Sequence, residues 1–392
     1  MKFVVAGYGS RGDVEPCVAV GRELLRRGHD VRMAVPPNML GFVESAGLAA
    51  VAYGPDSQAV EGFRRDLSKI QNPISKVLEV TEHVTQVWAQ KGTTLTELAN
   101  GADLLLAGIT EQGLAANVAE YYGIPLAALH FYPVQVLELG WLDWRITKEA
   151  EYAHRRALGL PEATDPSTLP LEIQAYDELC LPELAAQVAE LAGRRPFVGT
   201  LTLELPTDTD DKVLSWIAAG PPPIYFGFGS MEVTSPTDTV AMISAACAQL
   251  GERALIWSGP NDFTHIPHAE HVKVVDEIGQ AAIFPLCRAV VHHGGAGTTA
   301  AGLRAGIPTL ILFAVWLDQP IWATAVKQLE VGSARSFSAT TVESLIEDLS
   351  SILAPQYVTQ AREVAAKMTK PAESLASAAD LLEDAARRGH SG

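Results

Sequence analysis

The sequence predicts an α/β protein with two Rossmann-like βαβ domains. Three observations support this prediction. The chain has 392 residues, enough for two or three domains of about 150 residues each. Short apolar strands alternate with helical patterns in both halves. A stiff segment at Gly220-Pro221-Pro222-Pro223 precedes a second start of the same pattern.

The first half opens with a strand, a helix and a second strand. Phe3–Ala6 is apolar and strand-like, and apolar residues at helical spacing predict a helix over 14–27 that Gly28 ends. The next strand is expected at Val31–Val35. Short connections of this kind form a βαβ unit, so the sheet should be parallel and buried. Later elements are expected at Leu104–Ala107 (strand), about Leu114 to Tyr122 (helix) and Leu126–Leu129 (strand).

The second half repeats this pattern after a less periodic stretch at 131–200. The expected elements are a strand at Ile224–Phe228, a helix from about Val240 to Leu250, and strands at Ala254–Trp257, Val272–Val275, Ala289–His292 and Thr309–Phe313. We therefore predict domains at 1–212 and 213–375. A C-terminal helix within 376–392 is amphipathic enough to pack on either domain, and we expect it on the first.

The composition excludes several classes of partner. Lys and Arg number 29 against 46 Asp and Glu, for a formal net charge of −17, so the surface repels nucleic acid. A phosphate ligand must then be held locally by backbone N–H groups and a few side chains. The four cysteines are scattered, and no apolar stretch reaches the length of a membrane span. We expect a cytoplasmic protein with at most peripheral membrane contact.

The first glycine-rich loop, Gly7-Tyr8-Gly9-Ser10-Arg11-Gly12, fits the dinucleotide fingerprint G-x-G-x-x-G. The second strand, however, ends at Val35-Pro36-Pro37 without the carboxylate that binds ribose in that fingerprint. This disfavours a nicotinamide or flavin site. Asp13 stands at the start of the following helix, where an N-cap and a catalytic base are equally plausible.

The second glycine-rich loop follows a buried strand that ends at His292 and His293. Gly294-Gly295-Ala296-Gly297 comes next, and a helix is expected to start at Thr298. Bare N–H groups, a hydroxyl and a helix N-terminus form an anion site. The alternative, a tight turn with a core histidine, is less favoured because two histidines adjoin three glycines.

These two loops together resemble a known family. His293-Gly294-Gly295-Ala296-Gly297-Thr298-Thr299, followed by Asp318-Gln319-Pro320, is similar to the donor-binding signature of family 1 GT-B glycosyltransferases. Gly9-Ser10-Arg11-Gly12-Asp13-Val14-Glu15-Pro16 resembles the N-terminal motif of its actinobacterial branch. That branch includes the glycosyltransferases of vancomycin-group antibiotics and mycobacterial glycopeptidolipids, and sterol glucosyltransferases carry similar motifs.

The resemblance implies the GT-B fold, in which the two Rossmann-like βαβ domains face each other across a cleft. It also implies an inverting hexosyltransferase that uses a nucleotide-sugar donor, with an acceptor-binding first domain and a donor-binding second domain. Asp13 would be the general base. His293, Gly294, Gly295, Gly297 and Thr298 would hold the diphosphate, and Asp318 and Gln319 the sugar. Ser10, Arg11, Gly12 and Ser230 would face the phosphates and the sugar, and Trp257, Ser258 and Ile278 the nucleobase.

The resemblance also bears on metal and substrates. No metal pair of the D-x-D type is placed for the leaving group, so we expect no metal and no cofactor. Ala301 stands where plant-like relatives have a ribose-binding glutamate, which leaves the nucleotide open between dTDP and UDP. The sugar would be a hexose or 6-deoxyhexose. His265, His268 and His271 are better explained as a solvated loop than as a metal site, since Pro267 interrupts any helix.

The acceptor is expected to be hydrophobic, such as a glycopeptide, a lipopeptide or another secondary metabolite. Apolar residues that could bind it, or form ordinary core, are Leu137, Leu139, Trp141, Leu142 and Trp144. Three other functions remain open: a sterol or lipid glucosyltransferase that uses UDP-glucose, a nucleotide-sugar epimerase of the same architecture, and a catalytically silent nucleotide-sugar-binding module.

Overall fold

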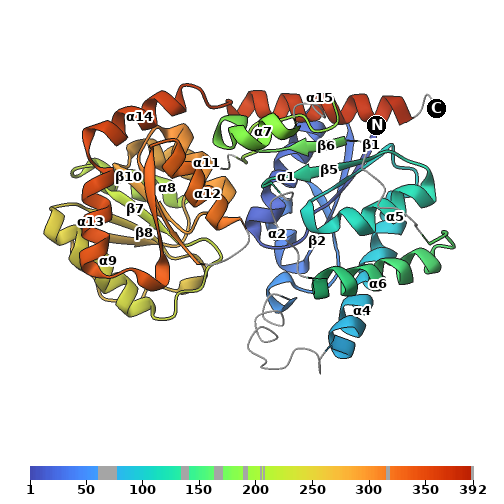
Figure 1. Cartoon of the computed structure of the whole chain (residues 1–392), viewed down its shortest axis with the longest axis horizontal. Helices are drawn as coiled ribbons and strands as arrows, with labels where there is room; N and C mark the ends of the chain where they lie inside the picture. The colour runs from blue at the N-terminus through green and yellow to red at the C-terminus, as the bar shows by residue number, and fades with distance from the viewer. Residues whose placement is uncertain are drawn as a thin grey trace. The chain divides into compact units, whose positions relative to one another are not determined.

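A computed structural model of the chain describes residues 1–60, 77–133, 141–162, 171–188, 193–203, 205, 208–314 and 318–389 (Figure 1). Their contacts form two compact units. Unit 1 is Met1–Tyr176, Ala186–Leu203 and Pro371–Gly392, and unit 2 is Asp177–Ala185 and Glu204–Lys370. Sequence analysis places the boundaries at 212 and 375, whereas the contacts place them at Leu203 and Lys370 and add a short earlier segment to unit 2.

Unit 1 is built on a six-stranded parallel sheet with the strand order β3-β2-β1-β4-β5-β6. Its elements are β1 (Lys2–Ala6), α1 (Arg11–Arg26), β2 (Asp30–Val35), η1 (Pro37–Met39), α2 (Leu40–Ser45), β3 (Ala49–Ala52), α4 (Val77–Ala99), β4 (Leu104–Ala107), η3 (Ile109–Glu111), α5 (Gln112–Tyr122), β5 (Leu126–His130), α6 (Trp141–Ala157) and β6 (Leu171–Gln174). The central strands are buried on both faces, so they are almost wholly apolar.

Helices cover both faces of this sheet. On one face, Leu95 of α4 and Val118 of α5 pack against Val4 of β1 and Leu105 of β4. On the other face, α1 packs against β2 and against the C-terminal helix α15 (Pro371–Gly389). The sheet is therefore the middle of three layers, as a βαβ protein requires.

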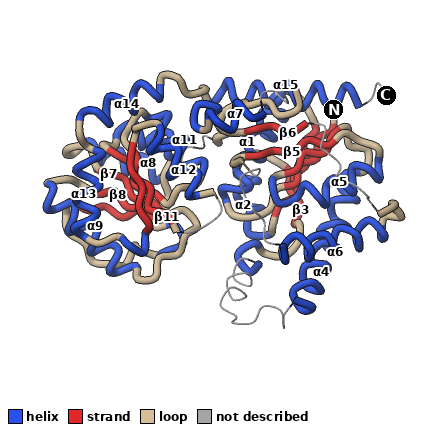
Figure 2. The backbone as a smooth tube through the Cα atoms, viewed as in Figure 1, coloured by secondary structure: helices blue, strands red, loops and turns tan. Residues whose placement is uncertain are grey.

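Unit 2 repeats the plan with a six-stranded parallel sheet in the order β12-β11-β10-β7-β8-β9. Figure 2 shows strands of this sheet in red with blue helices around them. Between β6 and α15 the chain forms η5 (Glu178–Cys180), α7 (Pro182–Val188), α8 (Asp208–Ala218), β7 (Ile224–Gly227), α9 (Pro236–Leu250), β8 (Ala254–Trp257), η7 (Gly259–Asn261), β9 (Val272–Val275), α10 (Gln280–Ile283), η8 (Phe284–Leu286), β10 (Ala289–His292), α11 (Ala296–Ala305), β11 (Thr309–Phe313), α12 (Gln319–Gln328), β12 (Gly332–Ser336), η9 (Phe337–Ala339), α13 (Val342–Ile352) and α14 (Pro355–Ala365). One boundary between the two units falls within α7.

Alternate residues of the unit 2 strands fill two separate cores. Phe226 of β7 lies in the core formed with α9 and α13, while its neighbour Tyr225 lies in the opposite core with α8, α10 and η8. This is the period of two expected of a strand buried on both faces. The cysteines are Cys17, Cys180, Cys247 and Cys287, and all four are free and buried.

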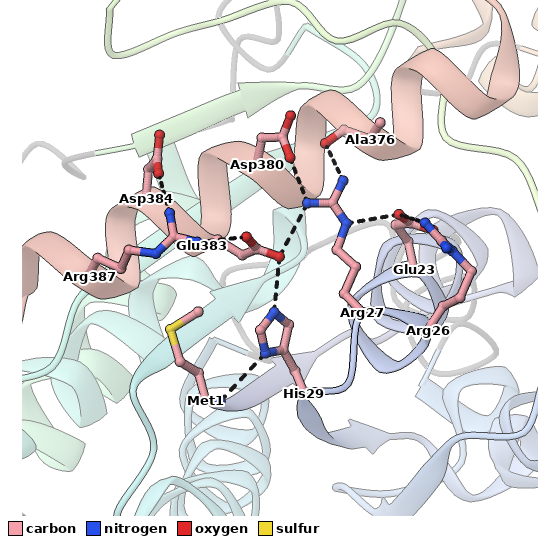
Figure 3. A network of polar contacts seen from close by, with 10 residues as sticks. All are labelled: Met1, Glu23, Arg26, Arg27, His29, Ala376, Asp380, Glu383, Asp384 and Arg387. Atoms are coloured by element: carbon pink, nitrogen blue, oxygen red, sulfur yellow. Dashed lines mark hydrogen bonds and ion pairs between the residues drawn. The ribbon is translucent and has the colours of Figure 1, made fainter.

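The C-terminal helix α15 is held to the rest of unit 1 by a polar network at the end of α1 (Figure 3). Arg27 Nη1 lies 2.6 Å from Asp380 Oδ1 and 3.2 Å from Glu383 Oε1, and its Nη2 donates to the carbonyl oxygen of Ala376. His29 Nε2 lies 3.0 Å from the same Glu383 oxygen. These contacts fix helix α15 on the outer face of α1.

The structure corrects several details of the predicted elements. Helix α1 begins at Arg11 and not at Val14, because Ser10 provides its N-cap. Strands β3, β6 and β12 lie outside the predicted set, and each forms an edge of its sheet. Strands β3 and β12 are mostly only partly buried or exposed, whereas β6 is buried but contains the polar residues Glu172 and Gln174, so all three have a weaker apolar pattern. None of the described helices is long and apolar enough to cross a membrane.

Candidate functional site

The two glycine-rich loops occupy equivalent places in their sheets. In unit 1 the chain passes from β1 outward to β3 and then returns to place β4 beside β1. In unit 2 it passes from β7 outward to β9 and returns to place β10 beside β7. Such reversals are switch points, and ligands of open α/β sheets bind at the carboxyl ends of the strands there. The loop after β1 and the loop after β10 both start at a switch point.

In unit 2, His293 lies between two glycines of neighbouring loops. A Cβ atom added to Gly229, which follows β7, would collide with Cε1 of the His293 ring. A Cβ added to Gly295 would lie 2.7 Å from Nε2 of the same ring. Gly229 also has a φ of +58°, which side chains rarely tolerate. The motif Gly227-Phe228-Gly229-Ser230 therefore supplies the surface on which the histidine rests.

The charge and the hydrogen bonds of the His293 ring both bear on what it can bind. Burial lowers the pKa of His293 to about 4, although a backbone hydrogen bond at Gly227 offsets part of that effect. Its Nδ1 atom is buried without a hydrogen-bond partner among the described residues. A buried polar atom in this state is costly unless a ligand or a water satisfies it.

His292 holds the Gly294 turn in place from the buried side. It is fully buried at the end of β10, and its Nδ1 accepts a hydrogen bond of 3.0 Å from the backbone N–H of Gly294. Burial and the neighbouring His293 lower the pKa of His292 well below its ordinary value, so the ring stays neutral. The sequence places His292 next to the predicted site, and the structure shows that it orients the loop.

The N-terminus of α11 offers unsatisfied backbone N–H groups. Its N-cap, Gly295, provides no capping side chain within the described chain, and Gly297 in the first turn is exposed. Thr298 Oγ1 lies 3.3 Å from Gln280 Nε2. Helix N-termini of this kind bind phosphate and other anions.

The Asp318-Gln319 motif lies beside this loop. A Cβ on Gly294 would approach Cβ of Gln319 to 3.2 Å, so the two segments are in direct contact. Gln319 Oε1 accepts a hydrogen bond of 2.9 Å from the Ala314 N–H. Asp318 is the N-cap residue of α12, and its Oδ2 accepts one of 3.0 Å from Trp322 Nε1.

The remaining predicted donor residues of unit 2 follow β7, β8 and β9. Ser230 is exposed directly after Gly229. Trp257, the last residue of β8, donates from Nε1 to the carbonyl oxygen of Asp276 at 2.7 Å. Ser258 is buried, and its Oγ accepts from the Phe263 N–H at 2.8 Å, so that side chain shapes its own loop. Ile278 packs in the core beneath α10.

In unit 1, Asp13 is the third residue of α1. Its Oδ2 accepts hydrogen bonds from the Ser10 N–H at 2.7 Å and from the Ser10 hydroxyl at 2.8 Å. Ser10 is the N-cap and Asp13 the N3 residue of a capping box. The capping hypothesis for Asp13 thus has a structural basis, although the residue is not the N-cap itself.

Gly9 makes room for this carboxylate. It has a φ of +138°, and a Cβ there would collide with Oδ2 of Asp13 and lie 2.6 Å from its Cγ. Asp13 is half-buried, whereas Arg11 and Gly12 are exposed. Arg11 Nε pairs with Glu15 Oε2 at 2.8 Å, and its guanidinium lies 4.9 Å from the centre of the Phe42 ring.

Some predicted features lie outside the described residues. Leu137 and Leu139 are among them, as are the side chains of Trp141, Leu142 and Trp144, so the candidate acceptor region is not seen. The described residues contain no group of three or more His, Cys, Asp or Glu side chains that could hold a metal ion. His271, one of the three spaced histidines, lies 3.0 Å from the carbonyl oxygen of Ser244.

Models of known protein families match each half of the chain. Residues 3–135 match the glycosyltransferase family 28 N-terminal domain. Residues 256–383 match the C-terminal domain of the erythromycin biosynthesis protein CIII-like family. The two matches contain the loop after β1 and the loop after β10, respectively.

Whole-length relatives agree with these matches. A glycosyltransferase of Mycobacterium tuberculosis is 61% identical, covering 99% of this chain and 100% of the relative. Vancomycin aglycone glucosyltransferase of Amycolatopsis orientalis is 30% identical, with coverages of 99% and 98%. A sterol 3-beta-glucosyltransferase of Arabidopsis thaliana is 27% identical, with coverages of 97% and 68%.

Solved structures share the fold. The calicheamicin glycosyltransferase CalG4 aligns with a TM-score of 0.74 at 18% identity, covering 99% of this chain and 98% of that one. The glycosyltransferase VinC, solved in complex with dTDP, aligns with a TM-score of 0.66 at 18% identity, with coverages of 99% and 100%. The predicted fold of two Rossmann-like units is confirmed.

Proposed function

Because the chain belongs to the glycosyltransferases of the GT-B antibiotic type, we propose that it moves a hexose or 6-deoxyhexose from a dTDP- or UDP-sugar to a hydroxyl of a hydrophobic acceptor. The reaction would invert the anomeric configuration and need no metal. Asp13 is the proposed general base, and the loop of His293 with the start of α11 is the proposed diphosphate site.

The observation that carries the proposal is the state of the His293 loop. A neutral imidazole with an unpartnered buried nitrogen lies next to a helix N-terminus that has no capping side chain in the described chain. The helix N-terminus favours an anion, and the neutral ring can donate to that anion in the tautomer that carries its one N–H on Nδ1. Two structural neighbours support the choice of ligand, since VinC was solved with dTDP and SsfS6 with thymidine diphosphate.

The proposed chemistry starts at the acceptor hydroxyl. Its oxygen attacks the anomeric carbon of the donor while Asp13 accepts its proton, and the bond from that carbon to the diphosphate oxygen breaks. The leaving nucleoside diphosphate takes the electron pair of the broken bond. His293 and the first-turn N–H groups of α11 then stabilise the negative charge that collects on the phosphates.

Metal independence follows from this assignment of roles. Hydrogen-bond donors and a helix dipole would supply the stabilisation that a divalent cation supplies in other transferases. The proposal expects EDTA to leave turnover unchanged. Loss of turnover in EDTA, with recovery on adding magnesium or manganese, would contradict it.

The test separates donor binding from transfer. D13A should bind dTDP and UDP as the wild type does, measured by thermal shift, and should lose transfer. H293A should weaken nucleotide binding. Vancomycin aglycone and a 3β-hydroxysterol are the probe acceptors, each with dTDP-glucose and UDP-glucose. Near-normal transfer by D13A would return Asp13 to a purely capping role.

A sterol glucosyltransferase that uses UDP-glucose is the second candidate. The similarity to the Arabidopsis sterol glucosyltransferase over 97% of this chain supports it. Ala301, which lies partly buried against the core below α11, leaves the choice between ribose and deoxyribose open. Transfer to the sterol from UDP-glucose, with none to vancomycin aglycone, would favour this candidate.

A further inference from the structure

A buried ion pair lies beside the loop that leads to Asp13, and the proposed chemistry does not use it. Nζ of Lys91, in α4, lies 2.9 Å from Oε1 of Glu111, in η3. The two residues are only 7% and 2% exposed. Burying two charges is costly, and an apolar pair could fill the same space without that cost. The pair therefore calls for an explanation.

Both charges have further polar or aromatic partners. Glu111 Oε2 accepts a hydrogen bond of 2.5 Å from the hydroxyl of Tyr53, which is fully buried. Lys91 Nζ lies 3.2 Å from the centre of the Tyr8 ring and 5.2 Å from that of Tyr53. A cation over an aromatic face is attracted by it, and more strongly when water is excluded. Gly54 closes the site, since a Cβ there would lie 2.9 Å from Cγ and Cε of Lys91.

Tyr8 connects this cluster to the proposed catalytic loop. Its ring covers the Lys91 ammonium, and its hydroxyl donates to the Pro55 carbonyl oxygen at 2.9 Å. Its own carbonyl oxygen lies 3.1 Å from the Thr110 hydroxyl, which is equally close to Glu111 Oε1. The ring, the hydroxyl and the backbone of Tyr8 are thus each anchored separately.

Tyr8 directly precedes Gly9, whose backbone contacts the Asp13 carboxyl group. A change at Tyr8 therefore moves the surface against which Asp13 is held. Because proton transfer depends on donor–acceptor distance and direction, a shift of about 1 Å costs on the order of a hundredfold in rate.

We propose that Lys91 and Glu111 are a positioning pair for the transfer reaction: they hold Tyr8, and through Tyr8 and Gly9 they set the place of the Asp13 carboxylate. The inference rests on the proposed role of Asp13. Neither Lys91 nor Glu111 touches substrate in this proposal. Their effect is on the turnover number rather than on donor binding.

The first test replaces both charges together. K91M/E111Q keeps the volume of the pair, leaves no single charge buried, and retains an oxygen that can accept from Tyr53. We expect a cooperative thermal unfolding transition and unchanged binding of dTDP and UDP by thermal shift. We expect kcat to fall about tenfold to a hundredfold with the KM for the donor unchanged. Release of free glucose from dTDP-glucose and UDP-glucose gives this readout with water as acceptor.

A matched control uses another ion pair of unit 1. Arg195 Nε and Glu172 Oε2 are 2.8 Å apart, and Glu172 lies on β6, away from the loop after β1. R195M/E172Q should keep kcat within about twofold, because the loop keeps its anchors. An equal loss of kcat in this control would contradict a specific role for Lys91 and Glu111.

A second test acts on the connecting residue. Y8L removes the aromatic face over Lys91 and should reproduce the kcat loss of K91M/E111Q. Y8F removes only the hydroxyl bonded to Pro55 and should lose less. If K91M/E111Q is folded and keeps wild-type kcat, the positioning role is wrong. If D13A keeps transfer, the proposed function fails instead, whatever the variants at Lys91 show.

Discussion

The loops after β1 and β10 both use a glycine to bring a functional side chain against the main chain, but the two side chains differ in charge and in hydrogen bonding. In each, a glycine with positive φ lets a functional side chain lie directly on the main chain: Gly9 under Asp13, and Gly229 under His293. Asp13 is a carboxylate that already accepts two hydrogen bonds from Ser10. His293 is a neutral ring whose Nδ1 has no hydrogen-bond partner among the residues that the structure describes.

This difference in hydrogen bonding suits the role that we propose for each loop. Hydrogen bonds to Asp13 fix its direction before any substrate arrives, which suits a group that must accept a proton along one line. The His293 nitrogen has no such partner among the described residues, so a ligand gains most by supplying one. The loop after β1 thus holds a charged side chain in one direction. The loop after β10 leaves a buried nitrogen that a ligand can contact.

The largest expected effect comes from removing the charge of Asp13 while keeping its shape. D13N retains an oxygen that can accept from the Ser10 N–H, but its amide is not a base. We expect kcat for transfer to fall about a thousandfold, with dTDP and UDP binding unchanged by thermal shift. A D13N enzyme with wild-type kcat would show that the capping role is the whole role of this residue.

The next effect concerns the surface under His293. G229A places a methyl group where Cε1 of the ring lies, so the ring must move. We expect nucleotide affinity to fall about tenfold to a hundredfold, measured by titration with dTDP and UDP. G251A is the matched control, because Gly251 has a φ of +70° but open space around its Cβ position. Equal losses in both variants would mean that backbone strain, and not the ring, is responsible.

A smaller effect is expected from the capping residue of the first loop. S10A removes the hydroxyl that donates to Asp13 but keeps the backbone N–H bond. The free energy of unfolding should fall by about 1 kcal/mol, and kcat by about tenfold. S235A removes the N-cap of α9 in unit 2, and it should cost similar stability without the loss of kcat. Parallel losses of kcat in the two variants would contradict the special role of Ser10.

The smallest effect is a dependence of stability on pH. Burial lowers the pKa of His293 from 6.5 to about 4, so the unfolded chain takes up a proton in this range while the folded chain does not. His293 therefore costs no stability near pH 7 and destabilises the fold as the pH falls from about 6.5 to about 4. Urea unfolding at pH 7 and pH 5 should show a loss of stability that is larger in the wild type than in H293N by on the order of 1 kcal/mol, because His130 and His292 contribute equally in both proteins. An identical loss in H293N would assign it to other groups, such as His130 or His292.

Sequence reasoning succeeded where one residue type has one strong local preference. The apolar strands before each loop and the glycines within it were sufficient to predict parallel sheets and the places of Asp13 and His293. It missed the first turn of α1, because the apolar spacing starts only at Val14 while the helix is extended to Arg11 by the polar capping box of Ser10 and Asp13. It also failed where the partner is distant in the chain.

The cluster of Lys91 and Glu111 shows the same limit more strongly. Lys91 lies within a long helix and Glu111 at the start of another, and each would ordinarily be assigned to solvent. Only the folded sheet brings them together under Tyr8. The His293 ring is similar, since its contact with Gly229 joins loops that are more than sixty positions apart.

The place of α15 has a consequence for the order in which the protein is made. This helix packs on α1 at the beginning of the chain, yet it follows every residue of unit 2. While the ribosome is still translating unit 2, one flank of α1 therefore lacks its cover. Domains usually complete their folding in the order of synthesis. Here unit 1 cannot be completed until α15 has been made, and that helix follows every residue of unit 2 in the chain.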